Sequence, residues 1–148
     1  RSITMADIRF SRQAAGAMLV PLQALLDAGA GAMRIKLYDG TRPATPETGV
    51  GSQVLLCNAP SSNTTTCATE TPAGTLTFAD ITTTTAENFS SPSSRTATWA
   101  RFTDSAGNAH MDADVGLTGS GKYVTMVSTT VVANAPVAFT VGGTLTLP

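Results

Sequence analysis

Hydrophobic residues near the start of the chain recur with the spacing of a helix. At about 100° per residue, six apolar side chains fall within one arc of roughly 120°: Ala15, Met18, Leu19, Leu22, Leu25 and Leu26. Ser11 offers a hydroxyl that suits a helix N-cap, and Gly29 is a residue type that ends helices. Pro21 lies inside the segment, where proline kinks a helix or starts its regular part. The pattern predicts one helix over about residues 11–28, with this arc as its packing face.

From Met33 onward the hydrophobic period changes to two. Met33, Ile35 and Leu37 alternate with polar or aromatic neighbours, as in a strand with one buried face. Short runs of this kind recur about every 8 to 12 residues, and glycine, proline, asparagine and aspartate separate them. The segment 104–108 has the residues of a hairpin connection. About seven or eight strands in this arrangement predict a mainly β fold, an antiparallel β-sandwich or jelly-roll-like domain with one N-terminal α-helix.

The chain is organised as one domain. Its 148 residues suffice for a single core, and no linker divides them. We expect residues 1–10 to form an N-terminal extension or arm and residues 11–148 to form a single β-sandwich domain that includes the helix. Ala28–Ala30 has the small-x-small look of a signal-peptide cleavage site, but Gln23 and Asp27 favour the amphipathic helix instead. No run approaches the ~18 apolar residues of a membrane span, so no membrane partner is expected.

The composition narrows the classes of function. Threonine, alanine and serine together supply 59 residues, whereas charged residues make up only 13% of the chain. An average domain carries about 25% charged residues, so hydroxyls and small side chains must cover this surface. Disordered chains are charge-rich and poor in apolar residues, which this chain is not. Nine basic and ten acidic residues leave no positive footprint for a phosphate backbone, which excludes a nucleic-acid partner.

Residues suited to catalysis are scarce. His110 is the one histidine, and Cys57 and Cys67 are the two cysteines. Any Ser-His-Asp or Cys-His site would have to use His110 as its base. The sequence contains no P-loop, GxGxxG or HExxH motif. We therefore expect a protein that is not an enzyme and has no cofactor.

Two local groups of residues have a functional and a structural interpretation. Cys57 and Cys67 flank a serine- and threonine-rich loop and form either a disulfide that staples it or two partly buried thiols. Asp104, Asn108, Asp112 and Asp114 resemble a loose set of calcium ligands, but their spacing is not that of an EF-hand. Solvated turn and strand acids are the favoured interpretation, and no metal site is expected.

Two single residues also have competing interpretations. His110 is either a pH sensor or a strand residue with no special role, and the second is favoured. Trp99 is the one tryptophan. It either anchors a partner or packs in the core against the N-terminal helix or the opposite sheet, and core packing is favoured.

Two segments resemble small virion proteins of tailed bacteriophages. The first is 35–47, IKLYDGTRPATPE, and the second is ATWARF at 97–102, followed by DSAGNAHMDADVG at 104–116. The resemblance runs loosely from the N-terminal helix to the closing strands. The sequence departs from the pattern of these virion proteins at the loop 57–67, which is longer than expected and carries the two cysteines.

The resemblance implies a capsid decoration (cement) protein, located on the virion after assembly in the host cytoplasm. Its expected partners are the major capsid protein and further copies of itself, with a homotrimer favoured by analogy with cement proteins. The N-terminal arm is the candidate for partner contact, through Ile3, Ile8, Arg9 and Phe10, together with Arg12 just after it. Two alternatives are a tail, neck or fibre component of the virion and a carbohydrate-binding, adhesin-like module.

Overall fold

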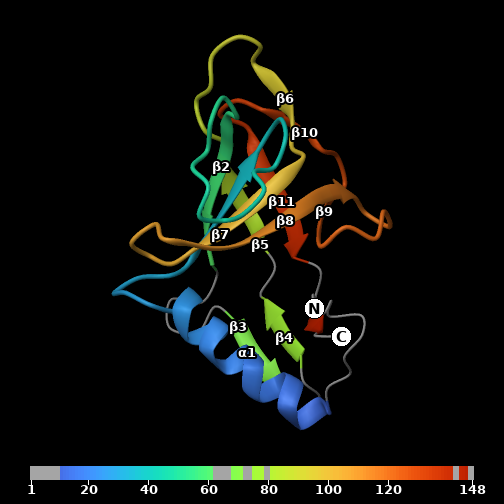
Figure 1. Cartoon of the computed structure of the whole chain (residues 1–148). Helices are drawn as coiled ribbons and strands as arrows, with labels where there is room; N and C mark the ends of the chain where they lie inside the picture. The colour runs from blue at the N-terminus through green and yellow to red at the C-terminus, as the bar shows by residue number, and fades with distance from the viewer. Residues whose placement is uncertain (1–10, 62–67, 72–74, 79–80, 142–143, 147–148) are drawn as a thin grey trace.

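The computed structural model describes residues 11–61, 68–71, 75–78, 81–141 and 144–146. Within these ranges, one helix, α1 (Arg12–Leu26), precedes twelve strands (Figure 1). The strands in chain order are β1 (Arg34–Tyr38), β2 (Leu55–Pro60), β3 (Ala68–Thr71), β4 (Thr75–Phe78), β5 (Ile81–Thr85), β6 (Ser94–Thr96), β7 (Trp99–Thr103), β8 (Ala109–Leu117), β9 (Val124–Met126), β10 (Thr130–Val132), β11 (Pro136–Val141) and β12 (Thr144–Thr146). The mainly β class with one N-terminal helix is confirmed.

Helix α1 begins where the sequence predicts. The Ser11 side chain accepts a hydrogen bond from the Ala14 amide at 3.1 Å, so Ser11 caps the first turn. The Asp27 amide donates to the Gln23 carbonyl at 2.9 Å and closes the last turn. Pro21 lies inside the helix. No helix in the described ranges has the length and apolar character that a bilayer crossing requires.

Seven strands form one sheet that nearly closes on itself. Their order is β2-β1-β7-β8-β9-β11-β5. At the seam between the two edge strands, Cys57 of β2 bridges to Ala86, the residue after β5, and the Glu87 amide donates to the Leu56 carbonyl at 2.8 Å. Closure of this kind satisfies backbone groups that an open sheet edge would leave unpaired.

One strand pair departs from the expected antiparallel arrangement. β8 and β9 pair in parallel, from Val115 opposite Val124 to Leu117 opposite Met126. The connection between them is short, and it doubles back through Gly119 and Gly121, which both have positive φ. Glycine adopts this backbone conformation without the steric cost that a Cβ atom brings. The expectation of a wholly antiparallel sheet was therefore wrong at this pair.

Two smaller sheets complete the fold. β10 pairs with β6, and β4 lies between β12 and β3. Helix α1 packs against β3 and β4, and Figure 1 shows these three elements together at one end of the molecule.

The helix and the large sheet share one hydrophobic core. Leu19 and Leu26 of α1 belong to the same buried cluster as Ile35 and Leu37 of β1. Because successive strand side chains alternate between faces, β7 contributes Ala100 and Phe102 to this core and turns its other residues outward.

Candidate interaction surfaces

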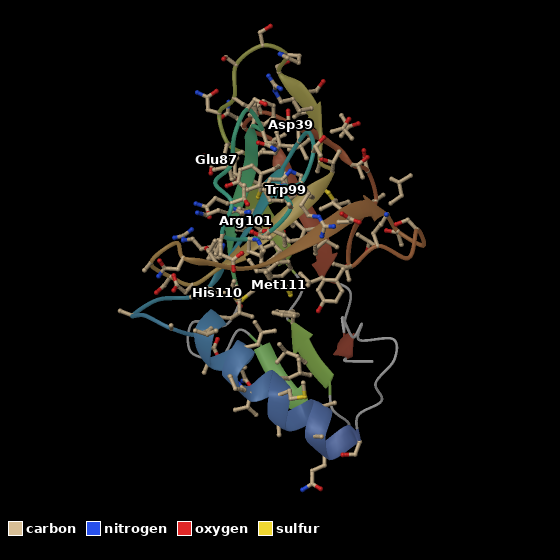
Figure 2. All side chains as sticks on the ribbon, in the orientation of Figure 1. Asp39, Glu87, Trp99, Arg101, His110 and Met111 are labelled. Carbon is tan, nitrogen blue, oxygen red and sulfur yellow. The ribbon has the colours of Figure 1, made fainter. Side chains whose placement is uncertain are left out.

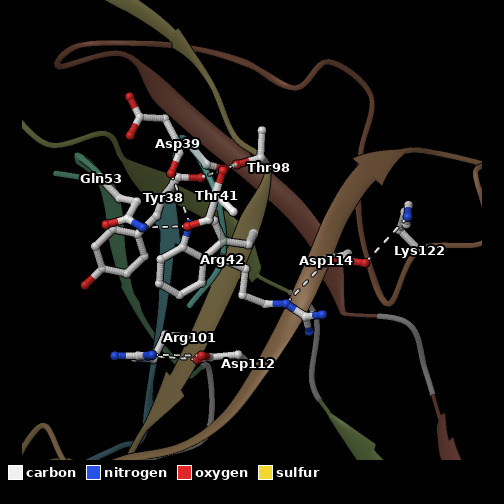
Figure 3. Close-up of polar contacts among 12 residues, drawn as sticks. Tyr38, Asp39, Thr41, Arg42, Gln53, Thr98, Arg101, Asp112, Asp114 and Lys122 are labelled. Carbon is white, nitrogen blue, oxygen red and sulfur yellow. Dashed lines mark hydrogen bonds and ion pairs between the residues drawn. The ribbon is translucent and has the colours of Figure 1, made fainter. Parts of the chain in front are cut away.

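The outer face of β1, β7 and β8 carries a compact aromatic and charged cluster (Figures 2 and 3). Cross-strand register places Tyr38 opposite Trp99, and Arg101 opposite Asp112. The Tyr38 and Trp99 rings stack with centroids 4.5 Å apart, and the Arg101 guanidinium lies 5.3 Å from the centre of the Trp99 ring. Arg101 binds Asp112 through two hydrogen bonds of 2.8 Å in a bidentate geometry.

The segment 39–54 covers this cluster. The Trp99 indole Nε1 donates to the Asp39 carbonyl at 3.0 Å, and Arg101 donates to the Thr48 carbonyl at 3.0 Å. Asp39 in turn accepts from the Val54 amide at 2.6 Å and from Arg95 at 2.7 Å. The hydrogen bond with Asp112 raises the pKa of Arg101, and burial raises that of Tyr38. The cluster therefore holds the long segment against the sheet.

Trp99 is buried, as the favoured interpretation predicted, but its packing partners differ. Only 1% of it is exposed, so it is not available as an anchor for a partner on this surface. It lies on the outer face of the sheet beneath the segment 39–54, and not against α1 or an opposite sheet. The sequence-based choice of packing partner was wrong because Trp99 alternates with Ala100 and Phe102, which take the core-facing side of β7.

The predicted hairpin turn at 104–108 is present. The Asp104 carboxylate accepts from the Ala106 and Asn108 amides, both at 2.9 Å, and from the Asn108 side chain at 2.8 Å. His110 Nε2 lies 3.3 Å from the same carboxylate. Burial raises the pKa of Asp104, but the hydrogen bonds from Asn108, His110 and Ala106 outweigh it and hold that pKa at about 2. His110 thus takes part in the turn.

The four oxygen-bearing residues weighed as calcium ligands are engaged in three separate sets of contacts. Asp104 and Asn108 bond to each other in the turn, and Asp112 is held by Arg101. Asp114 lies 3.5 Å from both Arg42 and Lys122. Within the described ranges, no group of three or more His, Cys, Asp or Glu residues is placed to hold a metal ion.

Several residues named from the sequence lie wholly or partly outside the described part. Ile3, Ile8, Arg9 and Phe10 belong to residues 1–10, and the side chain of Arg12, the first residue of α1, is likewise not described. Cys57 is buried in β2, and this burial raises the pKa of its thiol to about 11. Cys67 lies outside the described residues, so the Cys57–Cys67 disulfide stays a prediction.

The outward side of α1 is apolar. Met18, Val20 and Leu25 are each close to half exposed, and Ala17 and Ala24 beside them are exposed as well. Sequence analysis assigned Met18 and Leu25 to the packing face, which is wrong. The core receives Ala15, Leu19 and Leu26, and Leu22 packs against it. The predicted arc was therefore correct at Ala15, Leu19, Leu22 and Leu26, and too wide at Met18 and Leu25, which lie at its edge.

A second apolar surface lies where β9 and β11 diverge. Two hollows of about 190 and 270 Å³ share Met126, Val127 and Ala138 in their linings. Val127 lies in the linings of both hollows and is 93% exposed, and Leu117 and Val132 are also about half exposed. Sequence reasoning missed this groove, because β9 and β11 pair at only two positions of the described part and the sequence does not mark the point where they part.

Comparisons of the chain with protein-family models, curated proteins and solved structures gave no significant match.

Proposed function

We propose that the protein is a non-enzymatic structural subunit of tailed-bacteriophage virions. Its specific role is that of a capsid decoration or cement protein that binds the major capsid lattice as a homo-oligomer. The observation that carries the proposal is the uncharged, apolar outer face of α1, with Met18, Val20 and Leu25 about half exposed. Exposed apolar surface on a charge-poor molecule is typical of a contact with another macromolecule.

The charged residues of the described part that lie nearest the core serve the fold. Arg101 and Asp112 hold the segment 39–54, and Asp104 organises the hairpin turn. Arg95 and Asp39 join β6 to the end of β1. These assignments give each of the partly buried ion pairs a role in the fold.

The proposed mechanism uses binding energy alone. Threonine, alanine and serine lose less side-chain entropy on ordering than lysine or glutamate, so they favour dense packing between subunits. Weak contacts made by each copy add up when many copies bind one lattice. The bound layer would then resist outward pressure on the shell by bridging neighbouring capsid subunits.

Binding to capsids tests this proposal. Purified protein is mixed with expanded capsids and sedimented, and the bound amount is measured against protein concentration. We expect saturable binding that persists in about 1 M salt, because salt screens ionic contacts and leaves apolar ones. An absence of binding to expanded capsids would contradict the decoration role. Detection of the protein at one vertex of intact particles would favour the tail or neck alternative.

The N-terminal arm provides a second test of the same role. Deletion of residues 1–10 is expected to abolish capsid binding while the circular dichroism spectrum keeps its β signature. Loss of both binding and the β signature would show that the segment belongs to the folded core and is not a contact arm.

The carbohydrate-binding alternative receives no support from the tryptophan. Sugar-binding surfaces use exposed aromatic rings, whereas Trp99 is buried and stacked on Tyr38. A glycan array with and without calcium, if it gave saturable binding, would revive this alternative.

A further inference from the structure

Strand β8 is paired along both of its edges only near its end. β7 pairs with one edge from Ala109 to Asp114. β9 joins the other edge only from Val115 to Leu117. Within the described part of the chain, no strand pairs with that second edge before Val115, and we call residues 109–114 on this side the unpaired edge of β8. Such an edge presents backbone N–H and C=O groups to any chain that can pair with them.

The strand register identifies the backbone groups that face the unpaired edge. The Val115 amide donates to the Thr98 carbonyl at 2.9 Å, on the β7 side of the strand. Backbone groups of successive strand residues point alternately to the two edges, so Asp112 and Asp114 direct theirs away from β7. The ladder with β9 begins only at Val115. It therefore leaves the Asp114 amide and both backbone groups of Asp112 without a backbone partner among the described residues.

An open hollow of about 480 Å³ borders this edge. It is lined by residues 111–114 of β8, by residues 121–123 of the connection to β9, and by Arg42 of the segment 39–54. Ligand-binding clefts have volumes of about 300–1,000 Å³, so this hollow is large enough to hold part of a bound chain. The backbone groups of Asp112 and Asp114 recur every two residues, about 6.7 Å apart, which is the repeat of an extended peptide.

The hollow has one positive charge that its own carboxylates do not balance. Arg42 and Lys122 each lie 3.5 Å from the Asp114 carboxylate, and all three side chains are about half exposed (Figure 3). The other acidic residue of the lining, Asp112, is already paired with Arg101 at 2.8 Å. Because two exposed cations share one carboxylate, a second carboxylate is attracted to this position and a cation is repelled.

We propose that the unpaired edge of β8 binds an extended peptide segment of a partner protein as an added strand, with an acidic side chain of that segment between Arg42 and Lys122. The peptide residue opposite Asp112 exchanges two backbone hydrogen bonds with it. In this mode of recognition the main-chain bonds give affinity and the side chains give specificity. The inference goes beyond the proposed function, because it names a mode of binding that does not require a capsid.

Amide hydrogen exchange, measured by NMR on the full chain, tests the added strand directly. The probes are a panel of seven-residue peptides of threonine and valine, with one glutamate placed at each position in turn. In the free protein the Asp112 and Asp114 amides should exchange rapidly, and a saturating peptide should slow both by about tenfold or more. The Val115 amide is the internal control, since its bond to the Thr98 carbonyl protects it with and without peptide.

Charge variants test the selection of an acidic side chain. R42Q/K122Q removes the two cations of the hollow and should weaken binding of the glutamate peptide by about five- to tenfold, because exposed ion pairs contribute about 0–1 kcal/mol each. The matched control is R34Q/K36Q, which removes two cations from β1, on the far side of β7, and should change binding by less than about twofold. A peptide with lysine in place of glutamate should bind the wild-type chain about tenfold more weakly. Urea unfolding establishes that both variants are folded.

Three results would overturn the inference. The Asp112 and Asp114 amides could already be protected in the free chain, which would show that the chain covers this edge itself. No peptide of the panel could slow their exchange at millimolar concentration, or the lysine peptide could bind as tightly as the glutamate peptide. Peptide binding by a chain that does not bind capsids would contradict only the decoration role. Capsid binding by a chain whose two amides stay unprotected with every peptide would contradict only the added strand.

Discussion

Arg101 connects three parts of the molecule through one guanidinium group. It binds Asp112 on the neighbouring strand, donates to the Thr48 carbonyl and lies over the Trp99 ring. Only 7% of the Arg101 side chain and 4% of the Asp112 side chain are exposed. Neither charge can therefore recover its hydration when the other is removed.

R101M is expected to destabilise the fold by about 3–5 kcal/mol, because it leaves the buried Asp112 carboxylate without its partner. Urea unfolding followed by Trp99 fluorescence measures the change. R42M serves as the control, since the Arg42–Asp114 pair is nearly half exposed and should contribute only about 0–1 kcal/mol. Equal, small effects of the two variants would show that water reaches Asp112.

Asp104 makes stability depend on pH in acid. Its pKa in the folded protein is about 2, below its ordinary value, so its hydrogen bonds contribute stability above that ordinary value. This contribution is lost as the pH falls through the folded pKa. D104N should cost about 1–3 kcal/mol at pH 7, and the difference from wild type should shrink between about pH 4 and pH 2. A difference that stays constant over this range would contradict the assigned hydrogen bonds.

Local chemistry predicted the Asp104 turn, but not the partner of Arg101. An aspartate that accepts from backbone amides two and four residues on is a signature readable from the sequence. If β7 and β8 paired residue by residue from that turn without interruption, Arg101 would lie opposite Met111. A one-residue bulge between Phe102 and Thr103 shifts the register, so that Arg101 faces Asp112 instead. The extra residue is His110 of β8, between the paired residues Ala109 and Met111, and the sequence of β8 does not mark it.

At the scale of elements, the hairpin turn between β7 and β8 also anchors the end of α1. The Ser105 hydroxyl donates to the Ala28 carbonyl at 3.1 Å, and Gly29 next to it has a φ of +99°. A Cβ atom on Gly29 would lie only 2.0 Å from the Ser105 Oγ. The helix end and the turn therefore fit together only when residue 29 lacks a side chain.

G29A should destabilise the fold by about 1–3 kcal/mol through backbone strain, with a further loss from the clash. G29A/S105A removes the clash and should recover part of this loss in thermal or urea unfolding. G49A is the matched control, since Gly49 has open space around it and should change stability by less than about 0.5 kcal/mol. A neutral G29A would contradict the close approach of the turn to the helix.

The elements themselves were more predictable than their packing. Ser11 marked the helix start, and the alternation after Met33 marked β1, because both signals lie within a few residues of chain. The core-facing side of α1 was predictable, but the edge of the arc at Met18 and Leu25 was not, since these exposed residues are as apolar as the buried ones. The choice between them depends on β3 and β4, which follow dozens of residues later.

For the molecule as a whole, composition and the period of two predicted the fold class, but not the way the sheet closes. The seam joins residues near 57 and 86, and β9 enters the sheet in parallel beside β8. Such long-range pairings depend on how all the strands of the molecule pair together, and not on any one segment of sequence. The groove between β9 and β11 follows from this topology, and so could not be located from the sequence.

Electron cryomicroscopy of intact particles from a phage that encodes this chain would show whether the chain is a structural subunit of the virion, as we propose. We expect density for the nearly closed sheet of this chain, repeated across the outer surface of the capsid. Particles that show no density for this chain anywhere on the virion would contradict the proposal.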